Sequence, residues 1–148
     1  RALLHRPDPG PLPALPVTIT HFDATRDLII VEARVWSSTA SLPVFLAIDT
    51  GSSETVLAPY VVDDLGYNPR DGEAITRVRS AVGEEQGYTL RVTQFATLGF
   101  TLPDFRVHVF DLAAGFGIDG LIGLSFLRQF NYEIRSIEGE IRVERAMT

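Results

Sequence analysis

Residues 45–52 read FLAIDTGS, and this stretch decides the fold of the chain. It lies at the end of Leu42 to Ile48, a nearly continuous apolar run that predicts a short strand buried on both faces. The strand leads directly into Asp49, and the sequence Asp-Thr-Gly-Ser has the residue types of a tight turn. Because an unpaired charge at the end of a buried strand is costly, a purely structural role for Asp49 is the weaker interpretation.

A second glycine-bounded stretch, GLIGLSFL, occupies residues 120–127. Its apolar pair, Leu121 and Ile122, lies between two glycines, and residues 121–130 are expected to contain a short amphipathic helix. Ser125 resembles the serine of a nucleophile elbow, but the second glycine of that motif is missing. We therefore interpret Ser125 as a residue at a helix start.

The remaining pattern predicts an all-β fold with one or two short helices. A helix is expected within residues 55–65, because Pro59 suits a first helical turn and Gly66 suits a helix end. Apolar alternation and turn signals predict strands at residues 17–20, 28–36, 74–81, 88–98, 105–110, 132–137 and 140–145. The polar turn VGEEQG at residues 82–87 joins two of these strands into a hairpin.

Composition limits the classes of function. Of the 148 residues 45% are hydrophobic, which is enough for one core, and the formal net charge is −6. The 13 Lys and Arg residues are scattered, which argues against nucleic-acid binding. The chain has no cysteine, so a thiolate zinc site is excluded. The three histidines lie far apart, so we expect neither a metal site nor a serine triad built from them.

Residues 1–16 are dense in proline, which favours extended chain. We interpret them as a linker or an N-terminal arm, and residues 17–148 as one folded domain. The chain opens on Arg1, so we expect further sequence upstream. No stretch reaches the roughly 20 apolar residues that span a bilayer. Localisation stays open, and we expect membrane attachment or export only through an upstream tether or signal.

Together these motifs resemble the retropepsin-like aspartic proteases, especially the single-domain bacterial relatives of the retroviral proteases. The resemblance runs from about Val17 to Arg145. It rests on Asp-Thr-Gly after an apolar run, then a hairpin, then hydrophobic-hydrophobic-Gly before a short helix. It implies a closed, barrel-like fold with a flap hairpin, and peptide hydrolysis by an activated water without metal or cofactor.

The resemblance also implies roles for individual residues. Asp49 corresponds to the catalytic aspartate, Thr50 to a threonine that bonds across a dimer, and Gly51 to a glycine that leaves room for water and substrate. Ser52 occupies a position whose hydroxyl can bond the carboxylate. The expected substrate-binding residues are those of the flap tip and the apolar pair with its glycine, namely Ala81, Val82, Gly83, Leu121, Ile122 and Gly123.

Two positions depart from the viral pattern. The viral enzymes place Asp after the catalytic tetrapeptide and Arg after hydrophobic-hydrophobic-Gly, and these residues form an ion pair. Here the two positions hold Ser53 and Leu124. The ion pair is therefore absent, and we expect dimer closure or rigidity to be arranged differently.

A single Asp-Thr-Gly implies two chains, because the reaction needs two carboxylates around one water. Asp119 was weighed as an intrachain partner, but no Thr or Ser follows it, so a role in bracing its loop is preferred. A homodimer that places Asp49 opposite Asp49 is the simpler arrangement. The alternating segment 141–144 is the candidate dimer interface, and an ordinary edge strand is its alternative.

We therefore expect a homodimeric aspartic endopeptidase that acts on protein or peptide substrates. The dyad must be singly protonated, so mildly acidic pH should favour activity. Two alternatives stay open. The same fold could serve as a non-catalytic peptide-binding or dimerisation module. The chain could also be half of a larger protease whose partner domain lies outside it.

Overall fold

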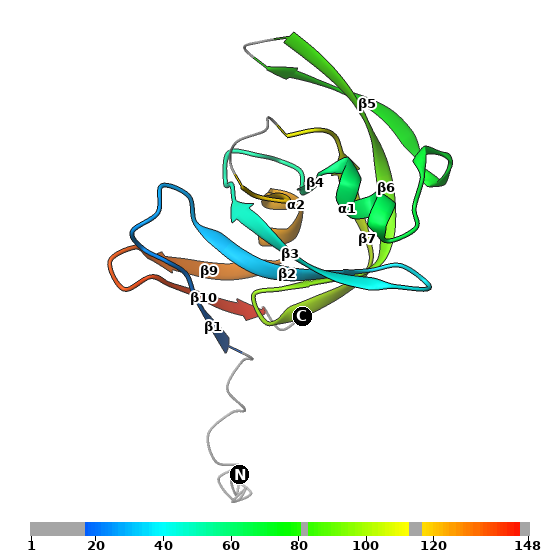
Figure 1. Ribbon diagram of the computed structural model, residues 1–148. Helices are drawn as coiled ribbons and strands as arrows, with labels where there is room; N and C mark the ends of the chain where they lie inside the picture. Colours follow the sequence, from blue (N-terminus) through cyan, green and yellow to red (C-terminus); the bar gives the residue numbers. More distant parts are fainter. Residues whose placement is uncertain (1–16, 81–82, 113–116, 146–148) are drawn as a thin grey trace, which may run out of the picture.

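The protein is built mainly of β-strands. The computed structural model describes residues 17–80, 83–112 and 117–145, and only the backbone of residues 76–80 and 83–85 (Figure 1). Its strands are β1 (Val17–His21), β2 (Ile30–Trp36), β3 (Ser41–Ile48), β4 (Val56–Leu57), β5 (Ala74–Ser80), β6 (Gly83–Thr97), β7 (Phe100–Val109), β8 (Gly120–Ile122), β9 (Phe130–Arg135) and β10 (Glu140–Arg145). The helices of the described residues are α1 (Pro59–Asp64), α2 (Leu124–Leu127) and the 3-10 helix η1 (Pro69–Asp71).

The larger sheet closes into a barrel. Its strands are hydrogen-bonded in the order β2-β3-β8-β4-β7-β6-β5, and β6 also pairs with β2. The register from Ala33 opposite Thr97 to Trp36 opposite Gln94 makes this closing contact. Strand β5 stays outside the ring and pairs only with the first half of β6. The predicted closed, barrel-like all-β fold is therefore confirmed.

The flap hairpin consists of β5 and the start of β6. It extends away from the barrel on the side opposite the three-stranded sheet (Figure 1). Ser80 pairs with Gly83, so residues 83–87, which the sequence predicts as a turn, belong to a strand. Polar residues are tolerated in this strand because a hairpin that projects from the barrel has little core to face. Two of the predicted tip residues, Ala81 and Val82, lie outside the described residues.

A separate sheet, in the order β1-β10-β9, supports the barrel. Strand β10 is central: Val143 lies between Thr18 of β1 and Tyr132 of β9. The edge-strand interpretation of residues 141–144 is therefore wrong. Both hydrogen-bonding edges of β10 are occupied, so it can offer a partner one face but no free edge.

Two short barrel strands are absent from the sequence prediction. A helix is predicted within residues 55–65, and α1 lies there from Pro59, but the strand β4 that precedes it is not predicted. Strand β8 lies within the segment predicted to lead into a helix. Both strands pair with partners distant in sequence, β4 with β7 and β8 with β3. Such short strands are fixed by tertiary pairing, which overrides local propensity.

Strand β3 is also less buried than predicted. Val44 and Leu46 point into the core, while Pro43 and Phe45 are exposed. Burial on both faces begins only at Leu46 and Ala47, where β8 pairs alongside. The end of β3, from which Asp49 emerges, is thus the most enclosed part of the strand.

Aromatic side chains fill the barrel and fix helix α2. Phe126 of α2 is fully buried, and its ring centroid lies 5.6 Å from that of Phe95 and 6.0 Å from that of Phe105. The ring centroid of Phe130 lies 5.0 Å from that of Phe126. Rings at these separations add specific packing to the burial of apolar area. Because Phe126 anchors α2 in the core, the position of residues 120–123, which precede the helix, is also fixed.

Candidate active site

Asp49 lies on a tight turn at the end of β3. Its backbone N–H donates to the carbonyl of Ile122, at 2.9 Å, and so continues the parallel pairing of β3 with β8. The N–H of Ser52 closes the turn on the Asp49 carbonyl at 3.2 Å. The Asp49 carboxylate accepts a hydrogen bond from the Gly51 N–H at 2.9 Å. The turn therefore holds a partly exposed carboxylate in a fixed direction.

The other residues of the tetrapeptide differ in what they contact. Thr50 and Gly51 are exposed, and a Cβ added at Gly51 would lie 3.2 Å from a carboxylate oxygen of Asp49. A larger residue at position 51 would crowd the space beside that oxygen. The Ser52 hydroxyl donates to the carbonyl of Glu54 at 2.8 Å, and not to the Asp49 carboxylate as the resemblance led us to expect.

The predicted apolar pair divides between the surface and the core. Leu121 is partly exposed, whereas Ile122 is 0% exposed and packs in the core. Successive side chains of a strand point to opposite faces, so only one of the two can face a ligand. Of the pair, only Leu121 has side-chain surface to offer a substrate.

Gly123 lets the Asp49 turn and α2 approach each other. A Cβ at this position would lie 2.1 Å from the carbonyl oxygen of Glu54 and 2.8 Å from that of Ser52. Its φ of −104° is open to any residue, so close approach and not backbone conformation requires the glycine.

Asp119 braces the middle of β3, just before the contact of β3 with β8 begins. Its carboxylate accepts hydrogen bonds from the Phe45 N–H, at 2.8 Å, and from the Tyr60 hydroxyl. Gly120 pairs with Leu46 and Ile122 with Ile48, so Asp119 and Asp49 flank opposite ends of the β3–β8 contact. Strand residues rise roughly 3.3 Å each, which separates the two carboxylates by far more than a shared water spans. The bracing role preferred for Asp119 agrees with this geometry.

The bond to Asp119 gives alkaline stability a specific pH dependence. Desolvation, and then the hydrogen bond to Asp119, raise the pKa of Tyr60 from 10.0 to about 12. The folded state therefore keeps this proton at pH values where the unfolded chain releases it. Stability from Tyr60 is complete below about pH 10 and is lost as pH rises toward about 12.

We expect Tyr60→Phe to remove this part of the alkaline destabilisation. The wild type should lose its stability advantage over the variant between about pH 10 and 12, as measured by thermal unfolding across that range. Tyr132→Phe is the control, because no carboxylate among the described residues accepts a hydrogen bond from that hydroxyl. Parallel pH curves for wild type and Tyr60→Phe would contradict the prediction. The effect should be small, since Tyr60 is half exposed.

Two residue pairs near the Asp49 turn were not predicted from the sequence. Thr55 and Ser125 join their hydroxyls at 2.9 Å, and His108 Nε2 lies 3.3 Å from a carboxylate oxygen of Glu54. Thr55 is 0% exposed. In the sequence, the signal for its role is that a polar residue stands just before the apolar Val56-Leu57. His108 of β7 thus contacts the segment that follows the turn.

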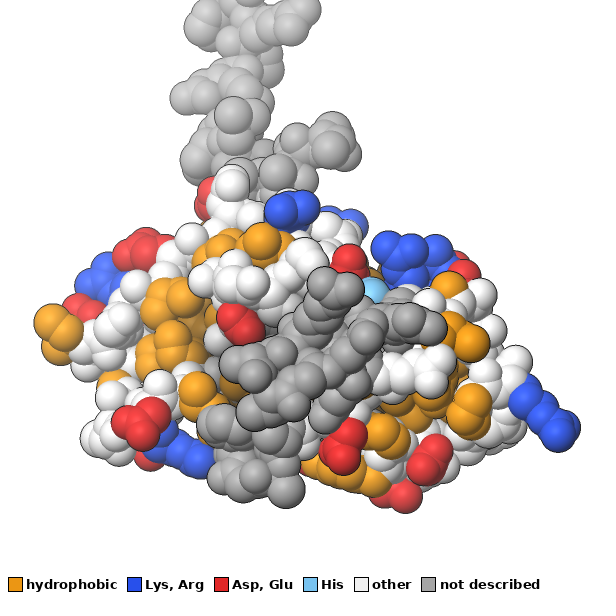
Figure 2. Space-filling view, turned by 90° about the horizontal axis from the view of Figure 1, so that it is seen from above, with side chains coloured by type: hydrophobic (Ala, Val, Ile, Leu, Met, Phe, Trp, Pro, Cys, Tyr) orange, Lys and Arg blue, Asp and Glu red, His pale blue; other side chains and the backbone are white. Residues whose placement is uncertain are grey.

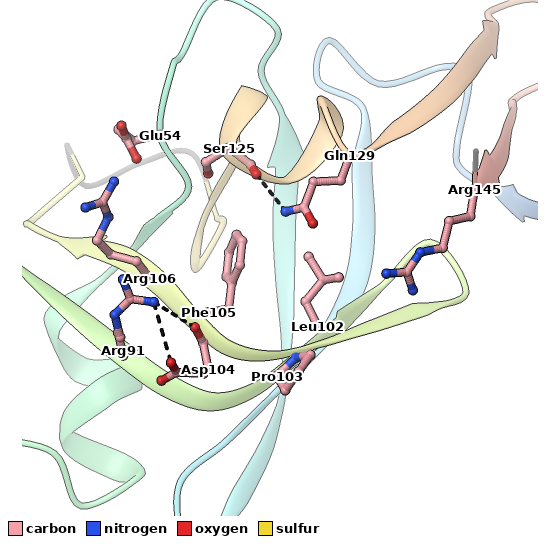
Figure 3. A pocket seen from close by; sticks show the side chains of 10 residues that line it. All are labelled: Glu54, Arg91, Leu102, Pro103, Asp104, Phe105, Arg106, Ser125, Gln129 and Arg145. Carbon is pink, nitrogen blue, oxygen red and sulfur yellow. Dashed lines mark hydrogen bonds and ion pairs between the residues drawn. The ribbon is translucent and has the colours of Figure 1, made fainter. Parts of the chain in front are cut away.

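A hollow of about 440 Å³ opens behind this segment (Figure 3). Glu54 lines it from the segment after the Asp49 turn and Ser125 from α2, while Arg91, Asp104 and Arg106 line it from β6 and β7. An ion pair between Arg91 and Asp104, 3.6 Å apart, lies within the hollow. Asp49 is not among its lining residues, nor is any described side chain of the flap hairpin, so the hollow is distinct from the surface around the candidate catalytic carboxylate.

The described residues hold no group of three or more His, Cys, Asp or Glu side chains that could bind a metal ion. Among the same residues, no helix has both the length and the apolar character needed to cross a bilayer.

Comparison with known proteins assigns the family. Residues 32–126 match the family model described as aspartyl protease. This match spans more than half of the 148 residues, so the chain belongs to the aspartyl protease family, and its fold is that of the retropepsin-like members. No curated protein sequence matches the chain.

Solved structures share the fold at low sequence identity. A retropepsin-like aspartic protease from Rickettsia conorii is 17% identical with a TM-score of 0.66, and the match covers 88% of this chain and 92% of the other. The retroviral protease-like domain of Ddi1 from Leishmania major is 18% identical with a TM-score of 0.57, covering 81% and 94%. An aspartic proteinase from Irpex lacteus is 16% identical with a TM-score of 0.54, covering 90% of this chain but 48% of that protein.

Proposed function

We propose that this protein is an aspartic endopeptidase, active as a homodimer in which Asp49 of each copy contributes one carboxylate. The observation that carries the proposal is the Asp49 turn itself. The turn presents a directed, partly exposed carboxylate, and the neighbouring glycine leaves its oxygen uncrowded. We further propose that residues 17–148 form the protease domain and residues 1–16 a linker or arm.

Two such carboxylates facing each other across a two-fold axis would share one proton, because both cannot be charged at close range. The ionised member takes a proton from a water, which attacks the scissile carbonyl, while the protonated member polarises that carbonyl. Two-fold symmetry gives both carboxylates the same surroundings, and the bound substrate decides which member takes which role.

Two observations support the second chain. Asp119, the competing carboxylate, accepts hydrogen bonds from Phe45 in the middle of β3 and from Tyr60 of α1, away from Asp49. In addition, this chain covers only 48% of the Irpex lacteus proteinase. One copy of the present fold thus corresponds to about half of a larger enzyme of the same class. Thr50, exposed at the turn, is the residue we propose to bond across the dimer.

The flap and the strand beneath it are the proposed substrate-binding surface. Leu121 would line a pocket beside the carboxylates, Gly123 would shape the loop below, and Gly83, with Ala81 and Val82, would cover the bound peptide. Figure 2 looks onto this side, where hydrophobic side chains are exposed among acidic ones, and Ile75 of the flap strand β5 is 73% exposed. We therefore infer a preference for peptides with apolar side chains around the scissile bond.

The dimer makes activity depend on protein concentration. We expect the specific activity on a peptide library to rise with concentration and to reach half its maximum near the dissociation constant measured by sedimentation equilibrium. Asp49→Asn should dimerise like the wild type. A strict monomer at high concentration, with constant activity per chain, would rule out the homodimer.

A further inference from the structure

The candidate catalytic turn is attached along its length to the segment that enters α2. Besides the bond from Asp49 to Ile122, the N–H of Leu124 donates to the Ser52 carbonyl at 2.8 Å, and the N–H of Ser125 donates to the Ser53 carbonyl at 2.9 Å. Ser53 and Leu124, the positions that lack the viral ion pair, thus contribute main-chain atoms to this junction. Because these bonds join main-chain atoms, any residue could make them, and they do not explain why Ser53 and Leu124 occupy these two positions.

The side-chain part of the junction consists of Thr55 and Ser125. Thr55 Oγ1 accepts the N–H of Gly123 at 3.2 Å and lies 2.9 Å from Ser125 Oγ. Ser125 Oγ in turn accepts the N–H of Thr55 at 3.1 Å. The two hydroxyls therefore satisfy one main-chain N–H on each side of the junction, in a place where Thr55 is 0% exposed and Gly123 is buried.

A side chain without a hydroxyl cannot replace Thr55 or Ser125 as a hydrogen-bond acceptor. A valine would match the shape of Thr55, but it would leave the buried N–H of Gly123 without an acceptor. An alanine at position 125 would likewise leave the Thr55 N–H unpaired. Because buried donors are nearly always satisfied, the junction would have to move to find water or another acceptor. The turn that carries Asp49 would move with it.

We propose that Thr55 and Ser125 are positioning residues, whose paired hydroxyls hold the Asp49 turn against α2 and so set the orientation of the carboxylate. The inference rests on the proposed function, since orientation matters only if Asp49 meets its copy in a dyad. In a symmetric dimer a displacement of the turn occurs twice, once in each copy, so the spacing of the two carboxylates is doubly sensitive to this bond.

Four variants test the proposal. Thr55→Val and Ser125→Ala each remove one hydroxyl, and Thr55→Ser keeps the hydroxyl and so is the rescue variant. Thr97→Val is the matched control, because Thr97 is also a buried threonine, 5% exposed, and its hydroxyl donates to the Glu32 carbonyl at 3.0 Å, in the β2–β6 contact. Thermal unfolding confirms that each variant is folded at the assay temperature.

Amide hydrogen exchange tests the hydrogen bonds of the junction and does not require the protein to be active. Thr55→Val should speed exchange at the Gly123 amide, and Ser125→Ala should speed it at the Thr55 amide, because each loses its acceptor. Thr55→Ser and Thr97→Val should leave both amides protected. Unchanged protection in both hydroxyl-deleted variants would overturn the proposed junction.

Peptide cleavage then tests whether the two Asp49 carboxylates are correctly oriented. Thr55→Val and Ser125→Ala should lower kcat roughly 10- to 100-fold with little change in KM, as expected when reacting groups are displaced by a fraction of an ångström to about one ångström. The double variant should lose no more than the single ones, since the pair acts as a unit. The acid and alkaline limits of the pH–rate profile should move closer together, because carboxylates held less closely share a proton less strongly.

The outcomes separate the two claims. A wild type that cleaves no peptide overturns the proposed function, and the catalytic role of the pair with it, while hydrogen exchange still decides whether the junction exists. An active wild type together with a folded Thr55→Val that keeps the same kcat and pH profile overturns the positioning role alone. A loss of kcat in Thr97→Val equal to that in Thr55→Val would also overturn it, because any buried hydroxyl would then have the same effect.

Discussion

Replacing Asp49 with asparagine is expected to lower kcat/KM at least about 10³-fold, because the substitution removes both the general base and its proton-sharing partner. Asparagine keeps the shape of the side chain, and its amide oxygen can still accept the Gly51 N–H that holds the carboxylate at 2.9 Å. The fold should therefore survive. The measurement is cleavage of a diverse peptide library at several pH values, with wild type and variant purified in parallel.

Asp64→Asn is the matched control for this substitution. Asp64 ends helix α1, is exposed, and lies outside the turn, so the variant should cleave like the wild type. Equal cleavage by wild type and Asp49→Asn would show that Asp49 is not the catalyst. No cleavage by either would favour a peptide-binding module or an incomplete enzyme on the same fold.

Mixing the two proteins distinguishes a shared site from an intrachain one. If each copy contributes one carboxylate, excess Asp49→Asn chains capture wild-type chains in mixed dimers that hold a single aspartate. At constant total protein, total activity should then fall with the square of the mole fraction of wild type, because only wild-type homodimers hold both carboxylates. Activity that depends only on the amount of wild type would place both carboxylates within one chain.

The sequence predicts those parts of this fold whose signals are local. Pro59 and Gly66 bound helix α1 as expected, because proline fits a first turn and Gly66 has a φ of 91° that favours glycine. The final hairpin around Gly139 is also placed correctly, and its φ of 67° has the same cause. The Asp49 turn can also be predicted from the sequence, because the glycine at position 51 is a local signal: a larger residue there would crowd the carboxylate.

What the sequence could not predict depends on contacts between distant segments. Strands β4 and β8 contain two and three residues, too few for a periodic pattern, and exist because β3 and β7 pair with them. The opposite faces of Leu121 and Ile122 follow from that pairing. The Thr55–Ser125 hydroxyl pair joins residues 70 positions apart, so neither residue alone identifies its partner.

Gly123→Ala is expected to be strongly destabilising, although it adds only one methyl group. The added Cβ would lie 2.1 Å from the Glu54 carbonyl oxygen, and the obstacle is backbone, which cannot rotate away like a side chain. We expect a loss of about 3 kcal/mol in the free energy of unfolding, the upper range for overpacking a well-packed site. The separation of the two segments would also stretch the 2.8 Å bond from Leu124 to Ser52.

Urea unfolding followed by the fluorescence of Trp36, the single tryptophan, measures this loss at fixed protein concentration. Gly66→Ala is the control, because nothing lies within 4 Å of its added Cβ and its positive φ alone should cost about 1 to 2 kcal/mol. If Gly123→Ala is no less stable than Gly66→Ala, the turn and α2 can separate freely. The close approach would then not hold Asp49, and the orientation of the carboxylate would have to come from the dimer partner.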